Sequence, residues 1–493
     1  MKQQVPRRTV LRGVLSMTGA LGIGMVPQEI IARQRGGGGA SAPTIDSTFQ
    51  LAQFINRRSY PDLPARAIEH AKMILASTFA SAAPGSLIDS ARILRDVAKQ
   101  RSGTPEATVW FDGTKLPAAA AARVNAGLSD AAASDDSDIR NTAHYGTNLA
   151  SAALAIAERT GATGQALLTG MVVGYEVAGR IGDARQNGRG GVHASQLVGF
   201  GGAAAAGKLL GLSGEQMAQA LGLIATSIGG IAIGTNSWAR EFMGANAAGA
   251  AVDAAEAALR GYLVNEDMLG TRGGFVDVFG GGRDAVRLLT ANLGARWDIE
   301  EFLAIKLWPG AHPFSGTLEA AVNVARQANA PADAVAKILI AGPNRTTVGG
   351  SRRPKDLVEA IHSLPYFVAS AIADKEFTWV HATDAKIFDP VVARLMPLVD
   401  VDPSPPAVNY KWGWGGTVTL VTTSGQRFTS TVDAPRGSGP RGIEWGDVDA
   451  KYRALMPDSK LPATRLEQIL DTIHGFDRVK NVSDFTRLLT PRG

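Results

Sequence analysis

Apolar residues recur three and four positions apart over much of the chain between residue 47 and about residue 262. This spacing is typical of amphipathic helices and predicts helices over residues 65–79, 118–129, 151–159, 164–181, 195–210 and 213–227. Ser213-Gly-Glu-Gln216 has the spacing of a capping box, and Gly211 suits the end of the helix before it. Because many of these positions are Ala or Gly, the helices can pack closely, and we expect a compact all-helical domain over residues 43–274.

The pattern changes at the Gly-rich segment 270–282. Beyond it, β-branched residues predict strands over 335–341 and 416–422, and a turn at 423–426 leads into a returning strand over 427–432. We therefore expect a smaller α+β domain over residues 275–440. Helical spacing resumes after about residue 445, and we expect residues 441–493 to return to the first domain, with the helix at 463–475 packed against it. The predicted fold class is mainly α.

The first 42 residues have the features of an export signal. Arg7-Arg8-Thr-Val-Leu11-Arg12 is a twin-arginine pattern, the uncharged run at 13–28 is too short to span a membrane, and Ala40-Ser41-Ala42 resembles a cleavage site. We expect residues 1–42 to be a twin-arginine signal peptide that the export machinery recognises, and the mature protein to be periplasmic. The alternative is a disordered basic tail on a cytosolic protein.

Charge and cysteine content narrow the possible functions. The formal net charge is +5, and the leader accounts for all of it, so the remainder is neutral. A neutral chain has no overall field to attract nucleic acid or a membrane surface, and we expect neither partner and no stable membrane span. There is no cysteine, which excludes disulfides, thiolate nucleophiles and cysteine-based metal sites.

Three segments look like cofactor or metal motifs but lack an essential part. Gly202–Lys208 resembles a phosphate-binding loop, yet Leu209 stands where Ser or Thr is needed. The run 135–138 is acidic but lacks the Gly and distal Glu of a calcium loop, and no predicted strand leads into Gly199-Phe-Gly201 as a dinucleotide site requires. We therefore expect no cofactor and no metal.

Histidines mark the candidate chemistry. Of the seven in the chain, four fall in short polar or Gly-rich breaks between Ala-rich runs: His144, His193, His312 and His362. Histidine is the side chain best suited to move protons near neutral pH, and loops on a rigid scaffold are where chemistry is usually carried. These positions predict one assembled acid/base site.

An ordered set of motifs resembles the MmgE/PrpD family over nearly the whole chain from about residue 47. The motifs are Asp135-Asp136-Ser137 followed by His144, Gly174–Arg180, Gly191-Val-His193-Ala-Ser195, Arg240–Ala248, Lys306–His312 and His362-Ser-Leu-Pro-Tyr366. The resemblance implies a large helical domain made from both ends of the chain and a smaller α+β lid domain between them. It also implies a homodimer, and a cofactor-free site in the cleft between the domains.

The resemblance also implies roles for individual residues. It makes His144, His193 and Tyr366 candidate catalytic residues, and it makes a second group candidate substrate-binding residues: Asp136, Ser137, Arg240, His312 and His362. Several family side chains are changed. Arg240 stands in place of a lysine, Met243 and Ser315 stand in place of histidines, and the acidic residue before Asp135 is replaced by Ala133 or Ser134.

These residues predict a cofactor-independent lyase, either a dehydratase or a decarboxylase, that acts on a small di- or tricarboxylate. Histidines would move the protons, and Arg240 would clamp a carboxylate through two parallel hydrogen bonds. One alternative is an epimerase or isomerase of a small dicarboxylate, which uses the same kind of site. The other is a periplasmic protein that binds a carboxylate without turnover, which the changes at Met243 and Ser315 favour.

Overall fold

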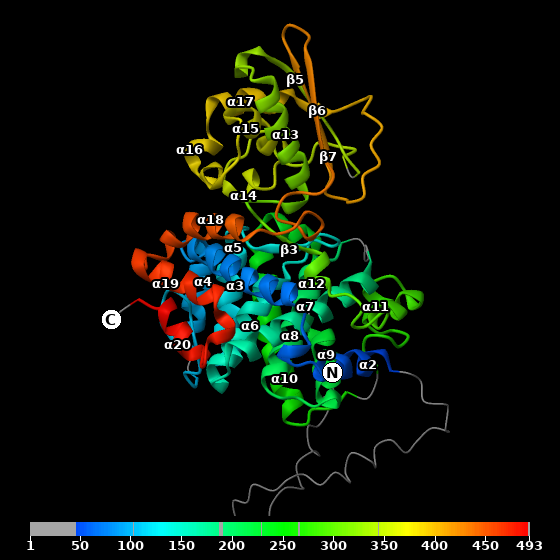
Figure 1. Ribbon diagram of the computed structural model, residues 1–493, viewed down its shortest axis with the longest axis vertical. Coiled ribbons are helices and arrows are strands. Elements are labelled where there is room, and N and C mark those ends of the chain that lie inside the picture. The colour runs from blue at the N-terminus through cyan, green and yellow to red at the C-terminus, as the bar shows by residue number, and fades with distance from the viewer. Residues whose placement is uncertain are drawn as a thin grey trace, which may run out of the picture. The chain divides into compact units, whose positions relative to one another are not determined.

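The computed structural model describes residues 46–101, 103–186, 191–227, 229–264, 267–343 and 345–491 (Figure 1). Residues Asp46–Gly493 form one compact unit, and the predicted signal peptide at 1–42 lies outside the described residues. The protein is mainly α-helical, as predicted. None of the helices in the described part of the chain is both long and apolar enough to cross a membrane.

The first half of the unit is built from helices. They are α2 (Ser47–Asn56), α3 (Ala65–Gly85), α4 (Asp89–Lys99), α5 (Ala118–Ala131), α6 (Tyr145–Thr160), α7 (Gly164–Arg185), α8 (Ser195–Leu209), α9 (Gly214–Ser227) and α10 (Ala239–Leu259). All six helices expected from apolar spacing are present. The buried positions of α8 are mostly Gly and Ala, which lets α7 and α10 pack closely against it.

Local signals set several helix ends. The Ser213 hydroxyl accepts from the backbone N–H of Gln216, and the Gln216 side chain accepts from the N–H of Ser213, so the predicted capping box forms. Gly161 ends α6 in the left-handed conformation, with a φ of 65°. A Cβ there would be strained, which is why glycine suits this helix end.

Residues 315–432 form a smaller α+β part with its own core. Its sheet has the order β6-β5-β7-β8, in which β5 (Val335–Ala341) pairs parallel with β6 (Val399–Val401) and antiparallel with β7 (Gly416–Thr422), which forms a hairpin with β8 (Arg427–Val432). β5, β7 and β8 have the bounds that were predicted from the sequence. The helices are α13 (Ser315–Ala328), α14 (Leu357–Ala360), α15 (Leu364–Asp374), α16 (Asp384–Ile387) and α17 (Pro390–Leu395).

Two hydrophobic cores divide the unit. The larger core joins the first nine helices to residues near the C-terminus, and the second core lies between the sheet, α13 and α15. In the sequence between α10 and α13 the chain forms α11 (Phe275–Phe279) and α12 (Asp298–Glu301), and both contribute buried residues to the larger core. The exact domain boundaries at residues 274 and 440 stay predictions.

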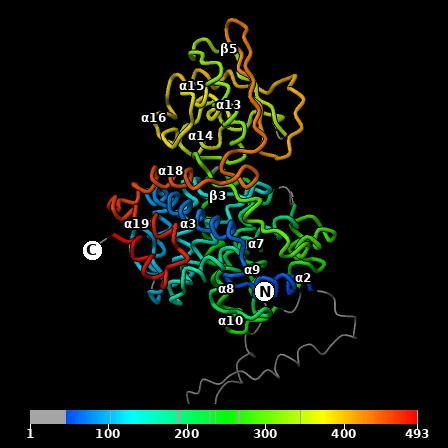
Figure 2. The backbone as a smooth tube through the Cα atoms, viewed as in Figure 1, coloured from blue at the N-terminus to red at the C-terminus, as the bar shows by residue number. Residues whose placement is uncertain are grey.

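The C-terminal helices pack against the beginning of the chain. They are α18 (Trp445–Leu455), α19 (Ala463–His474) and α20 (Val482–Thr486), and both α18 and α19 contact α3 (Figure 2). This return was expected from the helical spacing after residue 445. It buries Tyr452, whose hydroxyl donates to the carbonyl of Leu466.

A short antiparallel pair was not expected. β3 (Asp136–Asp138) pairs with β4 (Leu303–Ile305), with Asp136 opposite Ile305. A second short pair joins β1 (Ala107–Thr108) to β2 (Lys115–Leu116). Because β4 ends one residue before Lys306, the β3–β4 pair brings the motif that begins at Lys306 next to the one that begins at Asp135.

Candidate active site

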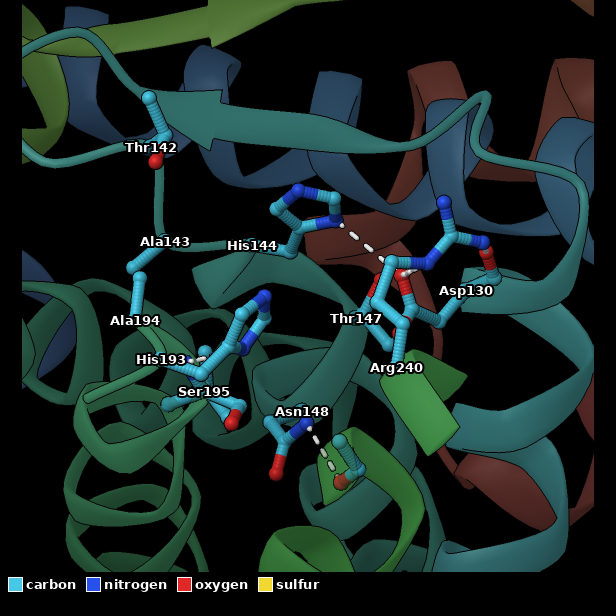
Figure 3. A pocket seen from close by; sticks show the side chains of 12 residues that line it. Asp130, Thr142, Ala143, His144, Thr147, Asn148, His193, Ala194, Ser195 and Arg240 are labelled. Carbon is cyan, nitrogen blue, oxygen red and sulfur yellow. Dashed lines mark hydrogen bonds and ion pairs between the residues drawn. The ribbon is translucent and has the colours of Figure 1, made fainter. Parts of the chain in front are cut away.

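A narrow cavity lies where the ends of several helices meet (Figure 3). Its volume is about 20 Å³, which is room for about one water molecule. It is lined by Asp130, Thr142, Ala143, His144, Thr147, Asn148, His193, Ala194, Ser195, Val198, Arg240 and Gly244. The cavity therefore brings together three of the residues predicted from sequence: His144, His193 and Arg240.

His144 immediately precedes α6 and has a carboxylate on each side of one ring nitrogen. Its Nδ1 lies 2.7 Å from Oδ2 of Asp135 and 3.2 Å from Oδ1 of Asp130, while its side chain is 24 % exposed. Burial by itself would lower the pKa of His144, but the charges and hydrogen bonds of Asp135 and Asp130 outweigh it and raise that pKa to about 9. At neutral pH the ring is therefore an imidazolium. Since Nδ1–H donates to the carboxylates, the N–H at Nε2 is the proton left to give away.

Asp135 is buried and holds its charge through several partners. Its Oδ1 lies 2.9 Å from Nζ of Lys306, and its Oδ2 also accepts from the Thr147 hydroxyl at 2.8 Å. Burial would raise the pKa of this carboxyl, but the positive charges of His144 and Lys306 hold it well below its usual range. Asp135 is therefore an anion at neutral pH that fixes the orientation of the His144 ring.

The turn between α5 and β3 carries Asp135 and is itself strained. Ala133 has a φ of 49°, a left-handed conformation that costs a residue with a Cβ roughly 1–2 kcal/mol. The ammonium of Lys306 donates to the carbonyl of Ala133 at 3.1 Å. From α18, the ammonium of Lys451 donates to the carbonyl of Ser134.

His193 is arranged differently from His144. Its backbone N–H donates to the carbonyl of Gly230, and its Nδ1 accepts from the backbone N–H of Ser195 at 3.1 Å. A ring that accepts at Nδ1 carries its proton at Nε2 in the neutral form. Burial lowers the pKa of His193 to about 4; the charge of Asp130 opposes this effect, and the positive charges of His144 and Arg240 add to it. His193 is thus a neutral hydrogen-bond donor at pH 7.

Arg240, on the first turn of α10, serves partly as a structural cap. One of its terminal nitrogens donates to the carbonyl of Asp130 at 2.7 Å and to that of Ala131 at 3.3 Å, at the C-terminal end of α5. Its Nε lies 3.7 Å from Oδ1 of Asp130. The guanidinium therefore stabilises α5 while its side chain lines the cavity, and the two-point clamp on a substrate carboxylate stays a prediction.

His312 and His362 lie close enough for the charges of Lys306 and His144 to affect them, but neither lines the cavity. His312 packs against Trp414, with ring centroids 4.7 Å apart, and burial together with the Lys306 charge pushes its pKa well below the usual value. His362 donates from Nδ1 to the carbonyl of Val358 at 2.8 Å, which leaves a lone pair on Nε2. Burial and the Arg240 charge lower the pKa of His362 to about 4.

Three predicted site residues lie away from the cavity. Oδ2 of Asp136 accepts from the backbone N–H of Gly146, and burial and the charge of Asp135 raise the Asp136 pKa to about 6. Ser137 is fully buried within β3. Tyr366 lies in the second core, where its hydroxyl donates to the carbonyl of His381 at 2.7 Å. The face of α15 that carries Tyr366 thus packs inward, and its catalytic role stays a prediction.

Asp130, Asp135 and His144 are the one set in the described part of the chain that has the ligand types and spacing for a metal ion. Two of their carboxylate oxygens already face cations, because Lys306 contacts Asp135 and Arg240 approaches Asp130. A divalent ion there would have to overcome repulsion from both cations. We assign no metal to this cluster.

The charged residues behind His144 were not among the sequence-predicted site residues. Lys306 opens one of the quoted motifs and precedes the predicted His312, so its place in that motif was a signal. Asp130 lies five residues before Asp135, on the last turn of α5, outside the quoted motif. Lys451 lies in a helix more than 300 residues away, and no local pattern connects it with the site.

Fold and site together define a mainly helical protein with a second, α+β core and a cavity where an imidazolium faces a neutral histidine. The model of the MmgE/PrpD N-terminal domain matches residues 49–287, and that of the C-terminal domain matches residues 308–473. The chain therefore belongs to the MmgE/PrpD family. It is also 25 % identical over 468 residues to cis-aconitate decarboxylase from Homo sapiens, an alignment that covers 90 % of this chain and 94 % of that protein.

Proposed function

We propose that the protein is a cofactor-independent lyase that acts on a small di- or tricarboxylate, with His144 as the proton donor. One observation carries the proposal: two histidines in one cavity have pKa values moved in opposite directions, to about 9 for His144 and about 4 for His193. Groups whose environments separate their pKa values in this way commonly take different roles in proton transfer. The similarity to a decarboxylase of a tricarboxylate supports the same class of reaction.

The charges around the cavity suit an anionic substrate. His144 and Arg240 line it together with the carboxylate of Asp130, and Lys306 contacts Asp135, the partner of His144. A carboxylate that enters would replace water at these cations in a site largely shielded from solvent, where their attraction is stronger than in water. The present volume is too small for a tricarboxylate, so we expect the cavity to widen when substrate binds.

Decarboxylation needs the groups that line this cavity. The bond from carbon to one carboxylate breaks, carbon dioxide leaves, and the electron pair that remains spreads onto the adjoining unsaturated acid. The Nε2–H of the His144 imidazolium then protonates the carbon, and solvent returns a proton to His144. The Nε2–H of His193 would meanwhile donate a hydrogen bond to the oxygen on which negative charge develops.

Dehydration or epimerisation would also need a base. His193 does not suit this role, because its Nδ1 lone pair accepts from Ser195. The free lone pair at Nε2 of His362 does suit it, provided the substrate reaches that ring. For this reason decarboxylation is our first choice within the lyases, and an epimerase that uses His144 and His362 is the second candidate.

The test is turnover by the purified chain from residue 43 onward, offered cis-aconitate, 2-methylcitrate and related acids. We expect carbon dioxide or water to be lost, and we expect His144→Gln to lower kcat by about 10²-fold or more. The matched control is His474→Gln. His474 packs against Trp445 and does not line the cavity, so this variant should leave kcat unchanged. Equal rates in the wild type and the His144 variant would defeat the proposal. Deuterium uptake without loss of atoms would favour the epimerase, and thermal stabilisation by acids without turnover would favour a binding protein.

We also propose that the protein is exported to the periplasm and acts as a homodimer. The large apolar side chains of Ile233, Trp238 and Phe242, at and just before the start of α10, are 88 %, 52 % and 50 % exposed. A cluster of this kind is common where a second subunit binds. Light scattering of the mature protein would measure its mass, and cell fractionation would locate it. A monomer, or retention in the cytoplasm, would refute the respective part.

A further inference from the structure

Lys451 has a buried side-chain nitrogen whose role the reaction does not explain. Burial lowers the pKa of Lys451 to about 7, so near neutral pH the group exists both as an ammonium and as a neutral amine, and both forms donate N–H hydrogen bonds. The residue lies on α18 and is 2 % exposed, and it is not one of the residues that line the cavity. A buried ammonium is costly unless oxygen atoms surround it. Oxygen atoms that accept hydrogen bonds therefore have to surround Nζ of Lys451 in a fixed geometry.

Those acceptors belong to the turn that carries Asp135. Nζ of Lys451 donates to the carbonyl of Ser134 and lies 3.4 Å from that of Asp135, and it also donates to the hydroxyl of Ser77 on α3 at 2.7 Å. The carbonyl one residue earlier, that of Ala133, accepts from Lys306. Three consecutive carbonyl oxygens of the turn, those of residues 133–135, thus lie beside two buried ammonium groups.

This turn needs support from outside itself. Ala133 has a left-handed backbone, a conformation in which L residues with a side chain are strained. The β3–β4 ladder begins at Asp136, and just beyond it the backbone N–H groups of Lys306 and Gly310 donate to the carbonyls of Asp135 and Ala133. The carbonyl of Ser134, between them, accepts from the side chain of Lys451. The carboxylate of Asp135 nevertheless has to meet Nδ1 of His144 at 2.7 Å, and a modest rotation of the turn would separate them.

Resting on the function proposed above, we propose that Lys451 is a positioning residue of this site: the N–H bonds from its Nζ hold the turn at residues 133–135 so that Asp135 stays against His144. Lys451 does not touch the cavity, and it acts only through the turn. On its other side it lines a separate surface pocket and approaches the ring of Trp379, at 5.8 Å. Residues from the C-terminal end of the chain thereby reach the group that carries the proton.

The proposal makes the proton affinity of His144 depend on a residue that His144 does not contact. Loss of the Lys451 ammonium would free the turn, Asp135 would move from the ring, and His144 would bind its proton less tightly. The other ionisable groups near His144, which any titration has to take into account, are Asp130, Asp136, His193, Arg240, Lys306, His312 and His362. The charge of Lys451 also acts on His312, Asp136 and Lys306, so a change at Lys451 alters their electrostatic surroundings as well.

The experiment compares two buried lysines that both join α3 to the C-terminal segment. Lys72, on α3, contacts Asp477 at 2.8 Å and the carbonyl of His474 at 3.1 Å, and it is 5 % exposed, yet it has no contact with the turn. We would titrate His144 by NMR of histidine-labelled, substrate-free protein in the wild type, Lys451→Met and Lys72→Met. We expect the His144 pKa to fall by about one unit or more in Lys451→Met and to stay unchanged in Lys72→Met.

Kinetics give the second readout. In Lys451→Met the basic limb of the kcat profile should move to lower pH together with the His144 pKa. A fall of that pKa from about 9 to about 8 should lower kcat about twofold at pH 8 and about tenfold at pH 10, with KM changed far less. Lys72→Met should lose stability but keep its pH profile. Lys451→Gln, which keeps two N–H donors, should recover part of the shift and replaces the methionine variant if that one does not fold.

The outcomes separate the two proposals. Because the NMR titration needs no turnover, a wild type without activity would defeat the lyase proposal and leave the test of Lys451 intact. An unchanged His144 pKa in a folded Lys451 variant would overturn the positioning role. So would equal shifts in the Lys72 and Lys451 variants, or a failure of both Lys451 variants to fold while Lys72→Met folds, since each points to general stabilisation.

Discussion

Replacing Asp135 by asparagine would remove one negative charge from the His144 ring with little change in shape. The amide oxygen of the new side chain could still accept from the Thr147 hydroxyl and from Nδ1–H of His144, so the contacts at 2.8 Å and 2.7 Å need not be lost. What is lost is the attraction between a carboxylate and an imidazolium. That attraction is the main reason why the His144 pKa lies above its ordinary value despite burial.

The size of the effect follows from the pKa. A shift from 6.5 to about 9 corresponds to about 3 kcal/mol of preference for the protonated ring. Asp130 remains at 3.2 Å in the variant and keeps part of this preference. We expect the His144 pKa in Asp135→Asn to fall by about 2 units, toward its ordinary value.

The same shift gives stability a definite pH dependence. Because the folded-state pKa of His144 is raised, its contribution to stability is complete below about pH 6.5 and is lost as the pH rises through about 9. The free energy of unfolding of the wild type should therefore fall by about 3 kcal/mol more across this window than that of Asp135→Asn. The variant should also be less stable at every pH, since Lys306 loses a buried partner at 2.9 Å, a loss that costs about 3–5 kcal/mol.

The assay is an NMR titration of His144 combined with urea unfolding at pH 6, 7, 8 and 9. Asp136→Asn is the matched control, because Asp136 is the next residue, equally buried, and bonded to Gly146 rather than to His144. In Asp136→Asn the His144 pKa should stay near 9. If His144 titrated alike in the wild type and Asp135→Asn, the electrostatic account of the proton donor would be refuted.

Two further predictions follow from the buried groups around the site. In the wild type the Asp136 pKa is raised to about 6, so this carboxyl lowers stability as the pH rises from about 4 to 6; Asp136→Asn should remove that loss and gain up to about 3 kcal/mol at pH 7 in urea unfolding. Tyr366→Phe should leave kcat and KM within about twofold of the wild type while costing about 1 kcal/mol of stability, because the Tyr366 hydroxyl donates to the His381 carbonyl. A large loss of kcat would show that Tyr366 takes part in the reaction.

The helices and the hairpin could be predicted because their signals are local. Apolar spacing gave the helices, and alternating β-branched residues gave β7 and β8 with their bounds. β3 could not be found in this way. Its sequence is Asp-Ser-Asp, and it becomes a buried strand only because Leu303–Ile305, more than 160 residues later, pairs with it.

The candidate site could also be predicted only in part. His144 and His193 stand in recognisable breaks between helices, and the cavity does bring them together. Part of the charge that affects their pKa values comes from Asp130, which lies outside any quoted motif, and from Lys306, which is distant from His144 in the sequence. The burial of Tyr366 in the second core could not be predicted, because a motif shows that a residue is present but not which face of its helix points inward.

The packing of α18 on α3 also matters while the chain is being made. α3 ends at Gly85 and α18 begins at Trp445, about 360 residues later. At typical synthesis rates of about 5–20 residues per second, α3 leaves the ribosome roughly 20–70 s before α18 exists to cover it. During that time the apolar surface of α3 that α18 later buries is open to other nascent chains, and a chaperone that shields it would determine how much active protein a cell obtains.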